Sequence, residues 1–147
     1  MPRSTWNPSG VAAWFITFST YGSRLPGDAR GSVDRHHNRP GTQLRAPDPT
    51  LERWCGARMA APDFLLGATE AEAVERAIRQ FCERIGWALH AVAVQSNHVH
   101  PLVSSPRRGP QALSAMKRAA SIELRRSGLV GPDARIWTRQ GSARPVW

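Results

Sequence analysis

The feature that most constrains the fold of this 147-residue chain is an apolar stripe at helical spacing in residues 69–85. Side chains that recur every three or four residues line one face of a helix, and that face has to be buried against another element. Thr69 and Glu72 have the spacing of a capping box, and Gly86 provides a C-terminal stop. We therefore predict an amphipathic helix over residues 69–85. Its stripe consists of Val74, Ala77, Ile78, Phe81, Cys82 and Ile85.

Shorter apolar runs around this helix predict strands. Residues 11–21 place apolar side chains at alternate positions, which is typical of a strand. Residues 89–95 and 98–104 predict a hairpin with a tight turn between them. Residues 110–127 begin with proline and are followed by glycine, as helices often are. The order strand, helix, hairpin, helix predicts an α+β fold, a ferredoxin-like split βαβ with helices packed on an antiparallel sheet.

The remaining segments are less regular. Residues 22–67 are rich in glycine, proline and arginine, and they contain one short helical pattern, within residues 49–59. An irregular stretch of this length in a small domain is often functional. We expect residues 1–10 to form a flexible arm and residues 129–147 an irregular tail, because glycine and proline recur in that tail. The length favours a single domain, 1–147.

Composition narrows the class of protein. The 41% of apolar residues can form a core and exclude a broadly disordered chain. No apolar run is long enough to span a bilayer, and two cysteines do not make a disulfide scaffold, so we expect a cytoplasmic protein without a membrane partner. Lys and Arg number 20 against 11 Asp and Glu, which gives a formal charge of +9. Such a charge attracts polyanions, although an arginine-rich protein without any nucleic-acid role is an equal alternative on composition alone.

Two histidines one residue apart form the clearest chemical motif. His98 and His100 lie on the second strand of the predicted hairpin, so both imidazoles point to the same face, about 7 Å apart along the strand. Two neutral imidazoles on one face can share a divalent metal if a facing element completes the ligand set. A pair of half-exposed histidines without a metal is the alternative.

Four blocks of sequence together resemble the HUH-type single-tyrosine transposases, which include the REP-associated tyrosine transposases and insertion-sequence relatives. The central block is Asn97-His98-Val99-His100 followed by apolar residues. The opening block reads ITFSTYG, LPGD and RGSV. A middle block reads GWAL and AVAV, and a closing block reads WTRQGSAR with the final Trp147.

The resemblance implies a ferredoxin-like HUH fold and cleavage and rejoining of single-stranded DNA. In this family a helix-borne tyrosine attacks a phosphodiester while a divalent metal polarises it. It implies that His98 and His100 bind the metal, Mg²⁺ or Mn²⁺, and that Glu123 is a third ligand one helical turn after the nucleophile. Relatives usually have an aliphatic residue where this chain has Pro101, which predicts a bulge or a lost hydrogen bond beside His100.

The chain departs from the family at the nucleophile. The position that carries the tyrosine in relatives corresponds to Ala119, whose methyl group cannot attack phosphorus. Tyr21, the sole tyrosine of the sequence, is the possible substitute. The resemblance also implies that basic residues surround the bound strand: Arg24, Arg30, Arg107, Arg108, Lys117, Arg118, Arg125, Arg126, Arg139 and Arg144.

The sequence therefore predicts a transposase-like protein that binds single-stranded or hairpin DNA, as a monomer or homodimer, and has lost tyrosine-mediated cleavage. One alternative is an active metal-dependent single-strand endonuclease that uses Tyr21 or water. Another is an RNA-binding or protein-interaction module that shares the fold.

Overall fold

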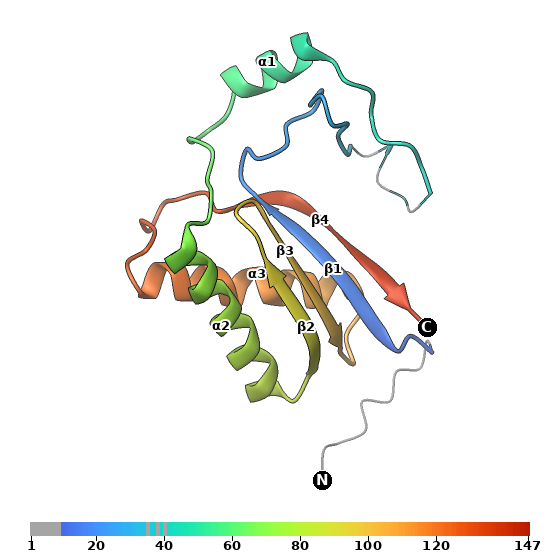
Figure 1. Cartoon of the computed structure of the whole chain (residues 1–147), viewed down its shortest axis with the longest axis vertical. Coiled ribbons are helices and arrows are strands. Elements are labelled where there is room, and N and C mark those ends of the chain that lie inside the picture. Colours follow the sequence, from blue (N-terminus) through green and yellow to red (C-terminus); the bar gives the residue numbers. More distant parts are fainter. Residues whose placement is uncertain (1–9, 35, 38, 40) are drawn as a thin grey trace.

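The computed structural model describes residues 10–147 except 35, 38 and 40. Its sheet has the strand order β2-β3-β1-β4, and neighbouring strands are antiparallel. Helices α2 and α3 pack together on one face of this sheet (Figure 1). This is the predicted α+β fold with its ferredoxin-like strand order. The elements are β1 (Ala13–Thr20), α1 (Pro49–Ala57), α2 (Ala68–Ile85), β2 (Ala88–Val94), β3 (His98–Ser104), α3 (Gly109–Arg126) and β4 (Trp137–Val146).

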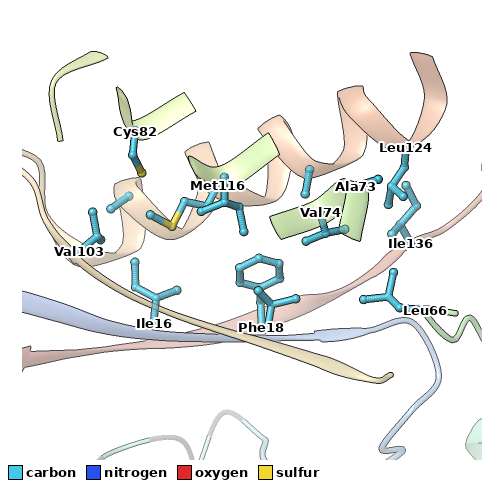
Figure 2. Packing of buried hydrophobic residues seen from close by; sticks show 14 of the residues in the cluster. Ile16, Phe18, Leu66, Ala73, Val74, Cys82, Val103, Met116, Leu124 and Ile136 are labelled. Atoms are coloured by element: carbon cyan, nitrogen blue, oxygen red, sulfur yellow. The ribbon is translucent and has the colours of Figure 1, made fainter. Parts of the chain in front are cut away.

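Alternation along the strands and the helical stripes together create the core. Ile16 and Phe18 of β1 are fully buried, as are Val99 and Val103 of β3. They meet the apolar faces of α2 and α3, so the core lies between the helices and one face of the sheet (Figure 2). The side chains between these positions point to the other face of the sheet, because successive strand residues alternate.

The start of α2 differs from the predicted capping box. Its N-cap is Gly67, and no side chain caps the helix there. Thr69 therefore lies inside the first turn, too far along to act as N-cap. The acidic residue of that turn is Glu70, whose carboxylate lies against Gly67: a Cβ on that glycine would be 2.6 Å from Glu70 Oε2. The predicted end at Gly86 is correct, and this glycine has a φ of 78°.

The prediction of an irregular tail over residues 129–147 was wrong, because most of this segment forms strand β4. This strand runs along β1 at the edge of the sheet, and the register shifts between Phe18 and Thr20. Glycine and proline usually indicate a turn, but an edge strand with a bulge tolerates both. Gly141 is needed for close packing, since a Cβ there would lie 2.7 Å from Leu113 and 2.8 Å from the Thr17 carbonyl oxygen.

Pro101 does not bulge the strand beside His100. Bonded pairs of β1 and β3 flank it in the same register, at Phe15↔Leu102 and Phe18↔Val99. On the other side, β2 pairs with it directly at Val92, and the register of that ladder shifts only between Leu89 and Ala91. The ring therefore costs the central strand a backbone donor without displacing the histidine.

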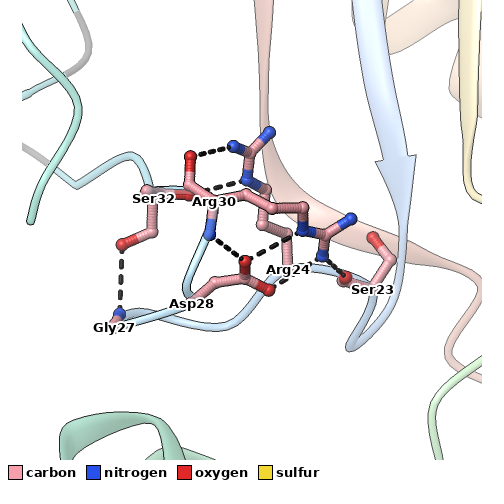
Figure 3. Close-up of polar contacts among 7 residues, drawn as sticks. Ser23, Arg24, Gly27, Asp28, Arg30 and Ser32 are labelled. Carbon is pink, nitrogen blue, oxygen red and sulfur yellow. Dashed lines mark hydrogen bonds and ion pairs between the residues drawn. The ribbon is translucent and has the colours of Figure 1, made fainter. Parts of the chain in front are cut away.

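The long segment between β1 and α2, which we call the β1–α2 connection, is more ordered than its sequence predicts. Asp28 accepts hydrogen bonds from the backbone and side chain of Arg30, and Arg24 donates to the carbonyls of Arg30 and Gly31 (Figure 3). The predicted short helix within residues 49–59 is present as α1. The expected flexible arm lies outside the described residues except for Gly10. None of the described helices is long and apolar enough to span a membrane.

Candidate functional site

The face of the sheet opposite the helices is the candidate site, and we call it the open face. Residues paired across antiparallel strands share a face, so the register assigns side chains to it. Of the described helices, only α2 and α3 pack on the sheet, and both lie on the core side. The open face carries Phe15, Thr17 and Ser19 of β1, His98, His100, Leu102 and Ser104 of β3, Ala91 and Ala93 of β2, and Ser142 and Arg144 of β4.

His98 and His100 lie together on this face. Their ring centroids are 4.5 Å apart, with the rings edge to face. The Nδ1 atom of His98 is 2.5 Å from Oδ1 of Asn97, and Nδ1 of His100 is 2.9 Å from Oγ1 of Thr17. An imidazole that donates from Nδ1 keeps a lone pair on Nε2. The described residues provide no hydrogen-bond partner for either Nε2 atom, so both are available to an outside ligand.

The surroundings of His100 hold its ring in place. The ring stacks on Phe15, with centroids 5.5 Å apart and an angle of 8° between the planes. Burial lowers the pKa of His100, and the neighbouring His98 lowers it further. Both effects favour the neutral imidazole, which is the form that binds metals.

The charges of the sheet have one sign. The four strands contain no Asp or Glu, whereas β4 contributes Arg139 and Arg144, both exposed. Arg144 pairs with Phe15 across the ladder and so lies on the open face. Phe15 is 40% exposed, which leaves an aromatic ring accessible beside the imidazoles. The open face thus combines flat rings and positive charge without a carboxylate.

The structure does not bring Glu123 to the histidines. Glu123 lies on α3, on the core side of the sheet, and its carboxylate pairs with Arg126 at 2.8 Å and with Arg76 of α2 at 3.4 Å. These guanidinium groups lower the pKa of Glu123, Arg126 more than Arg76. Among the described residues, no group of three or more His, Cys, Asp or Glu side chains could hold a metal. Within them, Glu123 therefore does not join the histidine pair.

Neither of the two nucleophile positions has a described hydrogen bond or ring contact with the histidine pair. Ala119 is on α3, on the core side of the sheet. Tyr21 follows β1 near the His98 end, but its hydroxyl accepts a hydrogen bond from the Ala60 amide at 2.9 Å. The guanidinium of Arg135 lies 6.0 Å from the centre of its ring. The described contacts thus tie the Tyr21 hydroxyl to the β1–α2 connection.

The predicted basic residues differ in their surroundings. Lys117, half-buried on α3, donates to the Thr138 carbonyl at 2.8 Å, and burial lowers its pKa. Arg24 and Arg30 bond the β1–α2 connection internally. Of the ten, we can place only Arg144 on the open face by its register. The others on α3 or just before it are exposed: Arg107, Arg108, Arg118, Arg125 and Arg126.

Three side chains around the histidines were not among the predicted site residues. Asn97 belongs to the central block, and the alternation of residues 11–21 already places Phe15 and Thr17 on one face. Their contacts with His100 depend on the register between β1 and β3, which the sequence does not specify.

Comparison with known proteins gives a likeness of fold. No protein-family model and no curated protein sequence matches the chain. Among solved structures, it is similar to one described as the "Structure of the REP associates tyrosine transposase bound to a REP hairpin", with 12% identity and a TM-score of 0.47. The match covers 92% of this chain and 56% of that chain. The likeness concerns the arrangement of helices and strands and says nothing of the chemistry.

Proposed function

We propose that this protein binds single-stranded or hairpin DNA across the open face, where the Nε2 atoms of His98 and His100 would hold a divalent ion beside a backbone phosphate. The observation that carries the proposal is the pair of available Nε2 atoms on a sheet face without carboxylates. An exposed sheet is flat and wide enough for unpaired nucleotides, whose bases stack on aromatic rings while phosphates meet positive charge.

Each open-face group has a role in this proposal. The ring of Phe15 offers a surface to one base, and its stacking on His100 fixes its orientation. Arg144, opposite Phe15 on β4, can hold a phosphate beside that base. Since the whole chain carries +9 charges, binding should weaken steeply as salt rises.

A divalent ion fits the histidine pair in part. His98 and His100 would supply two nitrogen ligands, and Asn97 and Thr17 would orient the rings from Nδ1. Without a carboxylate, this donor set suits softer divalent ions better than Mg²⁺. Such an ion would polarise the phosphodiester that it contacts.

We further propose that the protein binds DNA without tyrosine-mediated strand transfer. Ala119 cannot act as a nucleophile, and the Tyr21 hydroxyl bonds to Ala60. Incubation of the protein with single-stranded DNA and Mn²⁺ should give no covalent adduct on a denaturing gel. An adduct that disappears in Tyr21→Phe would contradict this part of the proposal.

The binding proposal is tested by fluorescence anisotropy with labelled single-stranded DNA, hairpin DNA and RNA at two salt concentrations. With Mn²⁺ present, the double variant His98→Ala/His100→Ala should bind the two DNAs about tenfold more weakly, because the ion beside the phosphate is lost. His36→Ala removes an exposed histidine of the β1–α2 connection and should bind like the wild type.

Two results would contradict the proposal. Equal affinity for all three nucleic acids, unchanged in the double variant, would indicate non-specific attraction by charge. A clear preference for RNA would favour an RNA-binding module.

A further inference from the structure

We propose that the outer face of α1 is a second contact for the same DNA, with Trp54 as a stacking surface for an unpaired base. This inference rests on the proposed function and adds a site that lies outside the sheet. Trp54 is 54% exposed, although an indole ring is among the side chains that gain most from burial.

The exposed residues of α1 form one face. Residues 50, 53, 54, 57 and 58 are exposed and recur at helical spacing, whereas Leu51, Glu52 and Cys55 are half-buried on the other side. The exposed face carries Trp54 with Arg53 and Arg58 and has no carboxylate. An exposed indole ring on a helix face with arginines suits an unpaired base with its phosphates.

The chain supports α1 only from its inner side. Asp48 caps the helix by accepting from the Leu51 amide at 3.1 Å. A Cβ at Gly27, whose φ is 88°, would be 2.3 Å from the Asp48 carbonyl oxygen, so glycine permits this close passage. None of the described helices and strands packs on α1, and it has no fully buried residue. A nine-residue helix is unstable alone, so contacts with the rest of the connection have to stabilise α1. These contacts are on its inner side, and its outer face is exposed to solvent.

Arg58 prepares the ring for stacking. Its guanidinium lies 3.8 Å from the centroid of the Trp54 ring and also donates to the Trp54 carbonyl at 3.3 Å. This contact limits the rotation of the indole before any ligand binds. The guanidinium is itself a flat cation on which bases stack, so the two side chains form one platform.

The charge and position of this platform favour DNA over a second copy of the chain. Two copies that each carry +9 charges repel one another, whereas a polyanion is attracted to Arg53 and Arg58. The end of the connection is fastened to the sheet beside the histidines, because the Leu66 amide donates to the Ser96 carbonyl in the turn before His98. Figure 1 shows α1 beyond this end of the sheet. A strand that leaves the open face past His98 would therefore approach α1.

The test combines protein variants with oligonucleotides of about 4 to 16 nucleotides. Trp54→Ala should weaken binding of the longer oligonucleotides about tenfold and leave the shortest unchanged, whereas Trp54→Phe should retain most of the affinity. An oligonucleotide with an abasic nucleotide at the stacked position should bind the wild type about as weakly as the intact oligonucleotide binds Trp54→Ala. With the abasic oligonucleotide, Trp54→Ala should cause little further loss of affinity, because the stacking partner is already missing. Arg79→Gln, on the outer side of α2, is the control for surface charge. Thermal melts should be unchanged, because Trp54 is outside the buried core.

The outcomes separate the two proposals. If His98→Ala/His100→Ala weakens binding but Trp54→Ala does not at any length, the α1 site is wrong and the open face stands. If the wild type binds no oligonucleotide, both are wrong. If Trp54→Ala changes sedimentation of the free protein but not DNA binding, α1 is a contact between copies.

Discussion

The two faces of the sheet use alternate residues of the same strands for different purposes. On β1, Ile16 and Phe18 are fully buried under the helices. Phe15, on the other face, stacks on His100 and is 40% exposed. On β3, Val99 is fully buried and its neighbours His98 and His100 turn the other way. The core and the proposed DNA-binding site therefore use neighbouring but separate side chains, and mutations should affect one without the other.

The largest expected effect is on the buried face. Phe18→Ala removes a ring that packs against α2, α3 and Trp137, whose ring is 4.9 Å away. The free energy of unfolding should fall by about 3 to 5 kcal/mol, because a large cavity remains. Chemical denaturation measures this loss. A loss below about 1 kcal/mol would contradict the described core.

The matched change on the open face should act on binding. Phe15→Ala should change the free energy of unfolding by less than about 1 kcal/mol, because the ring is partly exposed. It should weaken binding of single-stranded DNA by roughly 1 to 3 kcal/mol through lost stacking. Denaturation and anisotropy on the same preparation compare the two effects. A stability loss like that of Phe18→Ala, with binding intact, would place Phe15 in the core.

The β1–α2 connection should respond to acid separately from the sheet. Hydrogen bonds from Arg30 lower the pKa of Asp28 well below its ordinary range. Its contribution to stability is present above the unfolded pKa of about 3.9 and is lost as pH falls from there toward the lower folded pKa. At neutral pH, Asp28→Asn should cost the connection about 1 kcal/mol, so trypsin should cut within it about fivefold faster. Equal cleavage rates for variant and wild type would show that this ion pair does not hold the connection.

The smallest effect is expected from Glu123→Gln. Glu123 lies on the core side of the sheet, so this variant should bind DNA and Mn²⁺ with unchanged affinity. It loses the ion pairs with Arg76 and Arg126, whose side chains are largely exposed, so the free energy of unfolding should change little. Titration calorimetry with Mn²⁺ compares this variant with His98→Ala. A loss of metal affinity in Glu123→Gln comparable to that in His98→Ala would show that the carboxylate reaches the histidines.

Local pattern predicted most of the fold, since alternation and helical spacing located β1, α2, β2, β3 and α3 within a few residues. The edge strand β4 was not predicted, because glycine and proline usually indicate a loop. An edge strand also tolerates them, as it does Gly141 and Pro145 here. The common face of His98 and His100 follows from strand geometry alone. The separation of Glu123 from that face could not be predicted, because it depends on which side of the sheet α3 covers.

The central claim is that the open face, rather than the helical layer, meets the DNA. The most direct measurement is the mapping of amide and imidazole NMR shifts during titration with single-stranded DNA. We predict the largest changes at Phe15, Thr17, His98, His100 and Arg144. Changes confined to α2 and α3, with the imidazole signals of His98 and His100 unmoved, would contradict the account.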